Sequence, residues 1–214
     1  MIAFSDTCSA SGSSSVAETL DRLDTIFAGD WASQMDLIAQ EIAVLRDDHA
    51  LLRTFVHGNA LAKTWPRLSG AQSFTICSRP AFFARINLWM PYVNTAPDSY
   101  RRFLSVDVIH NHYFEFFTTC LLGPGYTSTF WRDPAHHPDR GIGDPVALLQ
   151  GSEHSLSDAA VWFVEKGADY HSQHWPSDFS VTLNVMPRPR VDEWSVQYVL
   201  DDAHRVSSII ASSQ

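Results

Sequence analysis

The sequence predicts a mainly β domain, a sandwich or barrel of short strands, preceded by a helical region. The first observation is that apolar residues from Val16 onward recur at three- and four-residue steps, as on one face of a helix. The second is that from about residue 72 the chain reads as short β-rich runs divided by Pro, Gly, Asn and Asp. Many short strands with turn signals between them are typical of a sandwich or barrel.

The helical region is expected over residues 16–66. Leu20, Leu23 and Ile26 give a first helix its apolar face, and Gly29 ends it. Asp30 is a plausible N-cap for a second helix, and a third is expected over about 48–63, before Pro66. Residues 1–15 are expected to be a flexible tail, because residues 5–15 are small and polar and cannot bury enough surface to become ordered.

The barrel is expected over residues 72–200. Period-two alternation is clearest in the runs Phe179–Val185 and Trp194–Leu200. The stretch 132–158 is rich in Asp, Pro, Gly and His and reads as a long loop. With 214 residues the chain can form a single domain over 16–214. The expected strands are 73–78, 82–90, 103–110, 114–122, 126–131, 160–165, 179–186 and 193–200.

Charge and composition exclude several classes of partner. The chain has 15 Lys and Arg against 24 Asp and Glu, and it lacks the basic patch that nucleic-acid binding requires. No apolar run is long enough to span a bilayer, and no signal-peptide pattern is visible at the start, so we expect a cytoplasmic protein without membrane contact. Three cysteines at scattered positions indicate neither a disulfide framework nor a Cys-based metal site. The remaining oddity is a surplus of histidine, ten residues in all.

Two of these histidines form a His-x-His pair within the segment 106–125. His110 and His112 lie two residues apart in an expected strand, and period two places both imidazoles on one face. Such a pair can chelate one metal ion, and Glu115 follows three residues later as a fourth ligand or a nearby base. Three protein ligands on one face would leave open positions, as a catalytic metal needs.

A third nitrogen ligand is expected from the cluster of residues 167–174. His171 has the better position relative to Gly167, with His174 as the alternative and His154 as a further candidate. The next strand carries Ser180, Thr182 and Asn184 at alternate positions. These polar side chains would line a cavity if Val181 and Leu183 pack outward against a second sheet.

These motifs resemble the two sequence motifs of the cupin superfamily. Within it, residues 72–200 are most similar to the cysteine-dioxygenase-like branch: the run from Thr182 to Pro189 resembles its Ser-Leu-His-x-Tyr-x-Pro-Pro strand, and Ile86–Trp89 resembles an earlier strand. The resemblance implies a jelly-roll barrel preceded by helices, mononuclear non-haem iron on three His, and Arg79 as a clamp for a substrate carboxylate. The chain departs from the branch at Thr182, Asn184 and Met186, where the branch has Ser, His and Tyr.

The leading hypothesis is therefore an Fe(II) oxygenase or dioxygenase that acts with O₂ on a small polar substrate, one that could carry a carboxylate. Thr182 and Asn184 are candidate hydrogen-bond partners for metal-bound His. Imidazole ligands suit Zn, Cu and Ni as well, so a Zn-, Mn- or Ni-dependent isomerase, lyase or hydrolase stays open. A non-catalytic ligand-binding cupin and, more remotely, a haem protein are further alternatives. Exposed edge strands make a homodimer one expected assembly.

Overall fold

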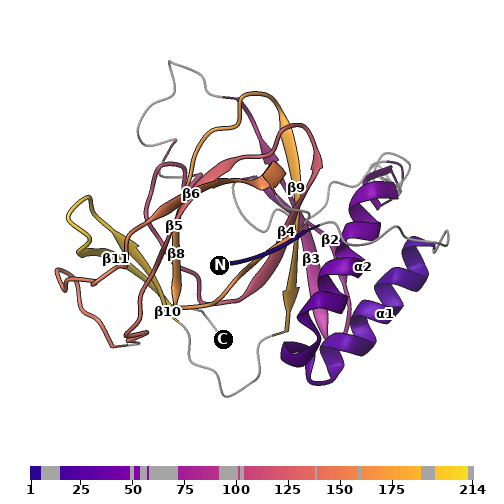
Figure 1. Cartoon of the computed structure of the whole chain (residues 1–214), viewed down its shortest axis with the longest axis horizontal. Coiled ribbons are helices and arrows are strands. Elements are labelled where there is room, and N and C mark those ends of the chain that lie inside the picture. Colours follow the sequence, from indigo (N-terminus) through magenta and orange to yellow (C-terminus); the bar gives the residue numbers. More distant parts are fainter. Residues whose placement is uncertain are drawn as a thin grey trace.

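The structure is a computed structural model of the whole chain, and it describes residues 1–5, 15–48, 51–53, 57, 72–91, 101, 104–137, 139–158, 161–188 and 196–211. It is mainly β, with antiparallel sheets and an N-terminal helical layer, which confirms the predicted fold class. The helices lie beside the strands rather than among them (Figure 1). None of the helices in this described part is long and apolar enough to cross a membrane.

Among the described residues, helices α1 and α2 make up most of the helical layer, and their bounds follow from local chemistry. Helix α1 (Val16–Ala28) begins at a capping box, in which Ser15 accepts from the Glu18 backbone N–H and the Glu18 side chain accepts from the Ser15 N–H. A short 3₁₀ turn, η1 (Trp31–Gln34), leads into α2 (Met35–Asp48). Asp30 precedes that turn but makes no side-chain cap, so the second helix begins later than the sequence predicts.

In the part of the chain that the structure describes, the largest sheet has six strands in the order β1-β7-β4-β9-β3-β2, all paired antiparallel. Strands β3 and β9 pair over their full length, with Arg85 opposite Asn184 and Asn87 opposite Thr182. On the other side of β9, Thr118 of β4 pairs with Asn184. The strands are β1 (Ile2–Phe4), β7 (Val161–Val164), β4 (Phe116–Leu122), β9 (Ser180–Pro187), β3 (Phe82–Trp89) and β2 (Ser73–Ser78).

A second sheet of three strands faces the first across the interior, and a hairpin extends it (Figure 1). Its order is β6-β5-β8, with Phe130 opposite His171. Isolated bridges join His110 both to His171 of β8 and to Val199 of β10, so this one residue links the sheet and the hairpin. The strands are β5 (Thr127–Arg132), β6 (Ser152–Ser155), β8 (Asp169–Gln173), β10 (Val196–Leu200) and β11 (Val206–Ala211).

The two faces of the six-stranded sheet carry different side chains, as strand alternation requires. One face packs on the helices: Val181, Leu183 and Val185 of β9 belong to the same apolar cluster as the helix residues Leu23 and Ile42. The expectation that Val181 and Leu183 pack against a second sheet is therefore wrong, because helices cover that face. The opposite face looks into the barrel, where Trp89, Phe116, Trp162 and Met186 meet Tyr126 and Phe130.

Several expected boundaries differ from the structure. Ile2–Phe4 is a strand paired with Trp162 and its neighbours, so the expected flexible tail is wrong for the first residues, and residues 6–14 lie outside the described part. Strand β6 lies inside the expected loop 132–158, and β8 and β11 were not expected from the sequence. Most of the third expected helix, over 48–63, lies outside the described residues.

Candidate metal centre

The His-x-His pair lies in an irregular segment rather than in a strand. Residues 104–112 make only isolated bridges, at Val106 and His110, and both Ser105 and Asp107 have positive φ. The prediction of a strand over 103–110 is therefore wrong. His110 is nevertheless fixed, because its N–H donates to the His171 carbonyl at 2.9 Å and its carbonyl accepts from the His171 N–H at 2.8 Å.

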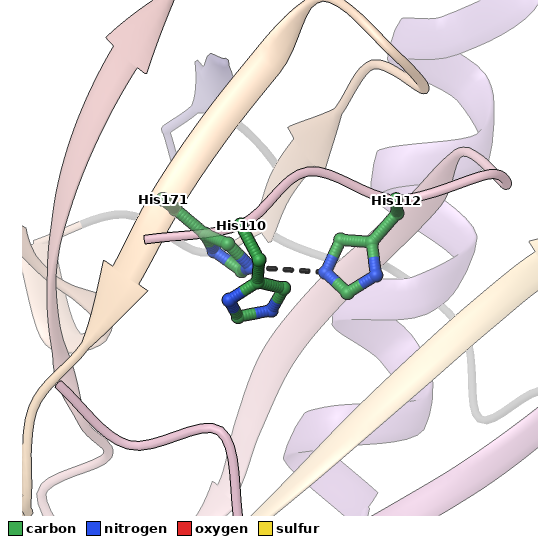
Figure 2. A group of neighbouring side chains, drawn as sticks. All are labelled: His110, His112 and His171. Carbon is green, nitrogen blue, oxygen red and sulfur yellow. Dashed lines mark hydrogen bonds between the residues drawn. The ribbon is translucent and has the colours of Figure 1, made fainter. Parts of the chain in front are cut away.

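Three imidazoles converge at this point (Figure 2). His110 and His112 come from the irregular segment and His171 from β8, and one ring nitrogen of each lies within 4.8 Å of the others. The Nε2 atoms of His112 and His171 are 2.9 Å apart. Two nitrogens bound to one ion through bonds of about 2.0–2.1 Å at a right angle would be about 2.9 Å apart. The separation fits two ligands of one ion, and it also fits an N–H···N hydrogen bond between the two rings.

Burial keeps these imidazoles neutral. It lowers the pKa of His110 below its ordinary value, and it lowers the pKa of His112 and His171 well below theirs. For His112, the neighbouring His110 and His171 and the Arg85 guanidinium lower the pKa further, because each disfavours a second positive charge. Neutral imidazole is the form that binds a metal ion, so the three lone pairs are available near pH 7.

The remaining ring nitrogens test whether the residues fit a metal. The Nδ1 of His110 lies 2.9 Å from the Val108 carbonyl, a contact that orients the ring and leaves Nε2 for coordination. The Nδ1 atoms of His112 and His171 are buried without a hydrogen-bond partner. Of the two facing Nε2 atoms of His112 and His171, only one can carry the shared proton, so a bound cation is the arrangement that uses both lone pairs. The donor set fits a metal ion.

A cavity of about 200 Å³ opens beside the cluster. Its described walls come from the six-stranded sheet, the irregular segment, β8 and β10, so both sheets contribute. Most of these side chains are polar and uncharged, and no Asp, Glu or Lys is found among them. The described lining residues are Gln72, Ser73, Arg85, Asn87, Trp89, Leu104, Ser105, His110, His112, Phe116, Gln173, Asn184 and Gln197.

Arg85 carries the charge of this cavity, and the sequence analysis missed it. It lies on β3 with its guanidinium 5.2 Å from the centre of the Phe114 ring. Its Nε is buried without a hydrogen-bond partner, and no described residue forms an ion pair with it. Burial accordingly lowers the pKa of Arg85. The sequence did hold a signal: in period two, Arg85 shares a face with Asn87 and Trp89.

Thr182 and Asn184 lie on the cavity side of β9, as alternation predicts. Asn184 lines the cavity, and its Oδ1 accepts from the Thr118 hydroxyl at 2.8 Å. The Thr182 hydroxyl accepts from the indole N–H of Trp89 at 3.0 Å. Neither residue makes a described hydrogen bond to the three His, so their expected role as partners of metal-bound His finds no contact here.

The structure does not bring the other candidates to the cluster. Arg79 pairs with Asp21 of α1 at 2.8 Å and does not line the cavity, and Glu115 belongs neither to the lining nor to the cluster. His174 is held by Asp107 at 2.8 Å and Thr129 at 3.0 Å. His154 bonds to the Ser152 hydroxyl. Of the two expected third ligands, His171 is therefore the one that lies with His110 and His112.

No family model and no curated protein matches the chain. Among solved structures, it is similar to a cupin domain from Bordetella pertussis Tohama I (9% identity, 58% of this chain, 100% of that one, TM-score 0.33). It is also similar to the DMSP lyase DddQ from Ruegeria pomeroyi DSS-3 (12%, 62% and 60%, 0.35) and to hydroquinone 1,2-dioxygenase from Sphingomonas sp. TTNP3 (10%, 58% and 70%, 0.33). The chain spans 48% of a further DMSP lyase structure. These likenesses are distant.

Proposed function

We propose that this chain is a metal-dependent enzyme of the cupin kind, and that it works as a mononuclear non-haem Fe(II) oxygenase on a small anionic substrate. The observation that carries the proposal is the convergence of three neutral imidazoles, with the His112 and His171 Nε2 atoms 2.9 Å apart. Three protein ligands from one side of an ion would leave open positions for substrate and O₂.

The metal would supply the binding and activation of O₂, and the chain's own residues would bind and orient the substrate. Arg85 lines the cavity without an ion-pair partner among the described residues. An anionic group that enters the cavity would supply the missing counter-charge. Phe114 and Phe116 pack against the His112 ring at 4.8 and 5.0 Å and keep water from that side of the site. Fe(II), an open cavity and a fixed cation together favour a small carboxylate or related anion.

A Zn-, Mn- or Ni-dependent lyase or isomerase is the second candidate. It is favoured by the absence of a carboxylate ligand among the described residues of the cluster, because three neutral imidazoles serve these metals as well as iron.

Oxygen dependence separates the two candidates. The chain would be loaded with Fe(II) and mixed with a panel of small carboxylates in an oxygen electrode, and the same mixtures would be run without O₂. We expect substrate-dependent O₂ uptake and no turnover under anaerobic conditions. Turnover that persists without O₂, above all with Zn, Mn or Ni bound, would make the lyase or isomerase the correct function.

The control is a variant that loses a neighbouring histidine but keeps the metal cluster. His174→Ala removes a histidine three residues from His171 that bonds to Asp107 and Thr129 outside the cluster, and it should keep the Fe(II)-dependent O₂ uptake. His171→Ala should lose it. Equal uptake by both variants would show that the reaction does not use the three-His site.

A further inference from the structure

The wall of the cavity beside Arg85 is built from one row of side chains across three strands. Arg85 of β3 pairs directly with Asn184 of β9, and Asn184 pairs in turn with Thr118 of β4. Directly paired side chains on one face of a sheet lie about 4.5–5.5 Å apart at their Cβ atoms. Both side chains line the same cavity, so one small molecule bound there can contact both.

The hydrogen bonds of this row fix which end of the Asn184 amide faces the cavity. The Thr118 hydroxyl donates its single proton to Asn184 Oδ1 at 2.8 Å. The Asn184 oxygen thus faces Thr118, and the NH₂ group of the same amide is left for the cavity.

Arg85 and the Asn184 NH₂ group are both hydrogen-bond donors. Arg85 can only donate, Asn184 turns its NH₂ group to the cavity, and no described lining residue carries a negative charge that could pair with an ammonium group. An ammonium beside these two groups would face a guanidinium and an amide N–H, and the other polar lining side chains would offer it only neutral acceptors. An oxygen that accepts would satisfy both.

We propose that Asn184, oriented by Thr118, is a specificity-determining residue that restricts the site to anions whose second polar group accepts hydrogen bonds, and that amino acids are rejected. The substrate class is a hydroxy or oxo acid rather than its amino counterpart. This inference rests on the proposed function for the position of the metal. The selectivity itself belongs to Asn184, Arg85 and Thr118.

The test compares two acids of equal size, 3-hydroxypropionate and β-alanine, as ligands of the Co(II)-loaded chain. The visible absorption of Co(II) reports both metal loading and ligand binding, without any turnover. We expect the wild-type chain to bind the hydroxy acid about tenfold more tightly or better, the effect of roughly one well-placed hydrogen bond. Comparing the ratio of the two dissociation constants between variants removes the metal's own preference.

Three variants test which residues cause the difference in affinity between the two acids. Thr118→Val keeps the size of the side chain but frees the Asn184 amide to turn, and it should reduce the ratio about fivefold. Thr118→Ser keeps the hydroxyl and should keep the wild-type ratio. Asn184→Asp replaces the amide donor by an acceptor, and it should reverse the preference toward β-alanine. Such a reversal cannot come from a general loss of structure.

Two results would overturn the inference: equal affinity of the wild-type chain for both acids, or a ratio that Asn184→Asp leaves unchanged. If Thr118→Val and Thr118→Ser gave the same ratio, Thr118 would not orient Asn184. A chain that takes up no Co(II) would contradict the proposed function instead. The two acids would then be titrated into the metal-free chain by calorimetry, because Arg85 and Asn184 are still present in it. The ratio of the two dissociation constants would test the inference in the same way.

Discussion

A single arginine illustrates at residue scale what the sequence could and could not predict. His110 and His112 could be predicted because His-x-His is a motif, and His171 was preferred to His174 for its position relative to Gly167, whereas Arg85 looks like an ordinary polar residue in an alternating strand. Arg79 was favoured instead through the family resemblance, and the structure pairs it with Asp21 outside the cavity. Which arginine faces the cavity depends on strand phase, and phase is fixed by the packing of β3 on the helices, which one sequence does not show.

Arg85→Met tests whether Arg85 is an anion site rather than a structural cation. A half-buried cation without a counter-charge is a cost to folding, so the variant should be as stable as the wild type or more stable. It should also lose the rise in Tm that a small dicarboxylate such as malonate gives the wild-type chain. Thermal unfolding with and without malonate measures both effects.

Arg79→Met is the matched control, because its ion pair with Asp21 is exposed. It should keep the malonate effect and change stability by less than about 1 kcal/mol. If malonate still stabilised Arg85→Met, the assignment of the anion site to Arg85 would be wrong.

The buried imidazoles predict how the metal-free chain responds to acid. The pKa values of His110, His112 and His171 are lowered on folding, mainly by burial, so below about pH 6.5 the unfolded chain binds protons that the folded chain excludes. Stability is therefore complete above that pH and falls as the pH decreases toward the lowered pKa values. Each group can contribute up to about 1.4 kcal/mol per pH unit.

Urea unfolding in the presence of a chelator, at pH 7.5 and pH 5.5, measures this dependence. The urea midpoint of the wild-type chain should fall between pH 7.5 and pH 5.5. The midpoint of His112→Asn, which lacks one of the three groups, should fall by less. A midpoint that does not change between the two pH values would mean that these imidazoles are not held neutral.

At the scale of elements, turns and alternation were predicted better than irregular segments. The strands over 73–78, 114–122 and 179–186 appear within a few residues as β2, β4 and β9, because alternation and the turn residues Gly123, Pro124 and Gly125 mark them. The segment 104–112 reads as a strand, but its path is set by bridges to β8 and β10, distant in sequence. The two His still lie on one side of the cavity. The inference drawn from their spacing is therefore correct, although the segment that carries them is not a strand.

Two glycines with positive φ give a prediction at this scale. At Gly123 (φ 80°), in the turn that follows β4, an added Cβ would lie 2.2 Å from the Phe179 carbonyl oxygen, whereas at Gly143 (φ 89°) it would meet nothing within 4 Å. Gly143→Ala carries only the backbone strain, about 1 kcal/mol, and Gly123→Ala carries the clash as well, for a total of about 3 kcal/mol or more. Equilibrium unfolding in urea compares them. Equal losses would contradict the close packing of the turn on β9.

At the scale of the whole molecule, the six-stranded sheet separates a structural side from a functional side. Its outer face is sealed by α1 and α2 through apolar contacts, and its inner face carries Arg85, Thr118 and Asn184 toward the cavity. Two of the three His, His110 and His112, line the same cavity from the opposite wall, so the cavity between them and Arg85 exists only when the two sheets face each other (Figure 1). The fold class could be predicted from local patterns, whereas this juxtaposition depends on tertiary packing.

The separation of the two sides predicts independent effects of mutation. Leu23→Ala leaves a cavity between α1 and the sheet and should cost about 2–5 kcal/mol of unfolding free energy, because Leu23 is fully buried. The folded variant should still bind Co(II) with wild-type affinity, since no helix residue lines the described cavity. Chemical unfolding and a Co(II) titration test the two halves of this prediction. Weaker Co(II) binding in fully folded protein would contradict the separation.

The metal content of the purified chain tests the central claim most directly. Elemental analysis of the wild-type chain, of a His110→Ala, His112→Ala double variant and of His174→Ala should show one metal ion per chain in the first and third, and a loss of the metal in the second. Full metal occupancy in the double variant, or no metal binding by the wild-type chain, would contradict the three-His centre.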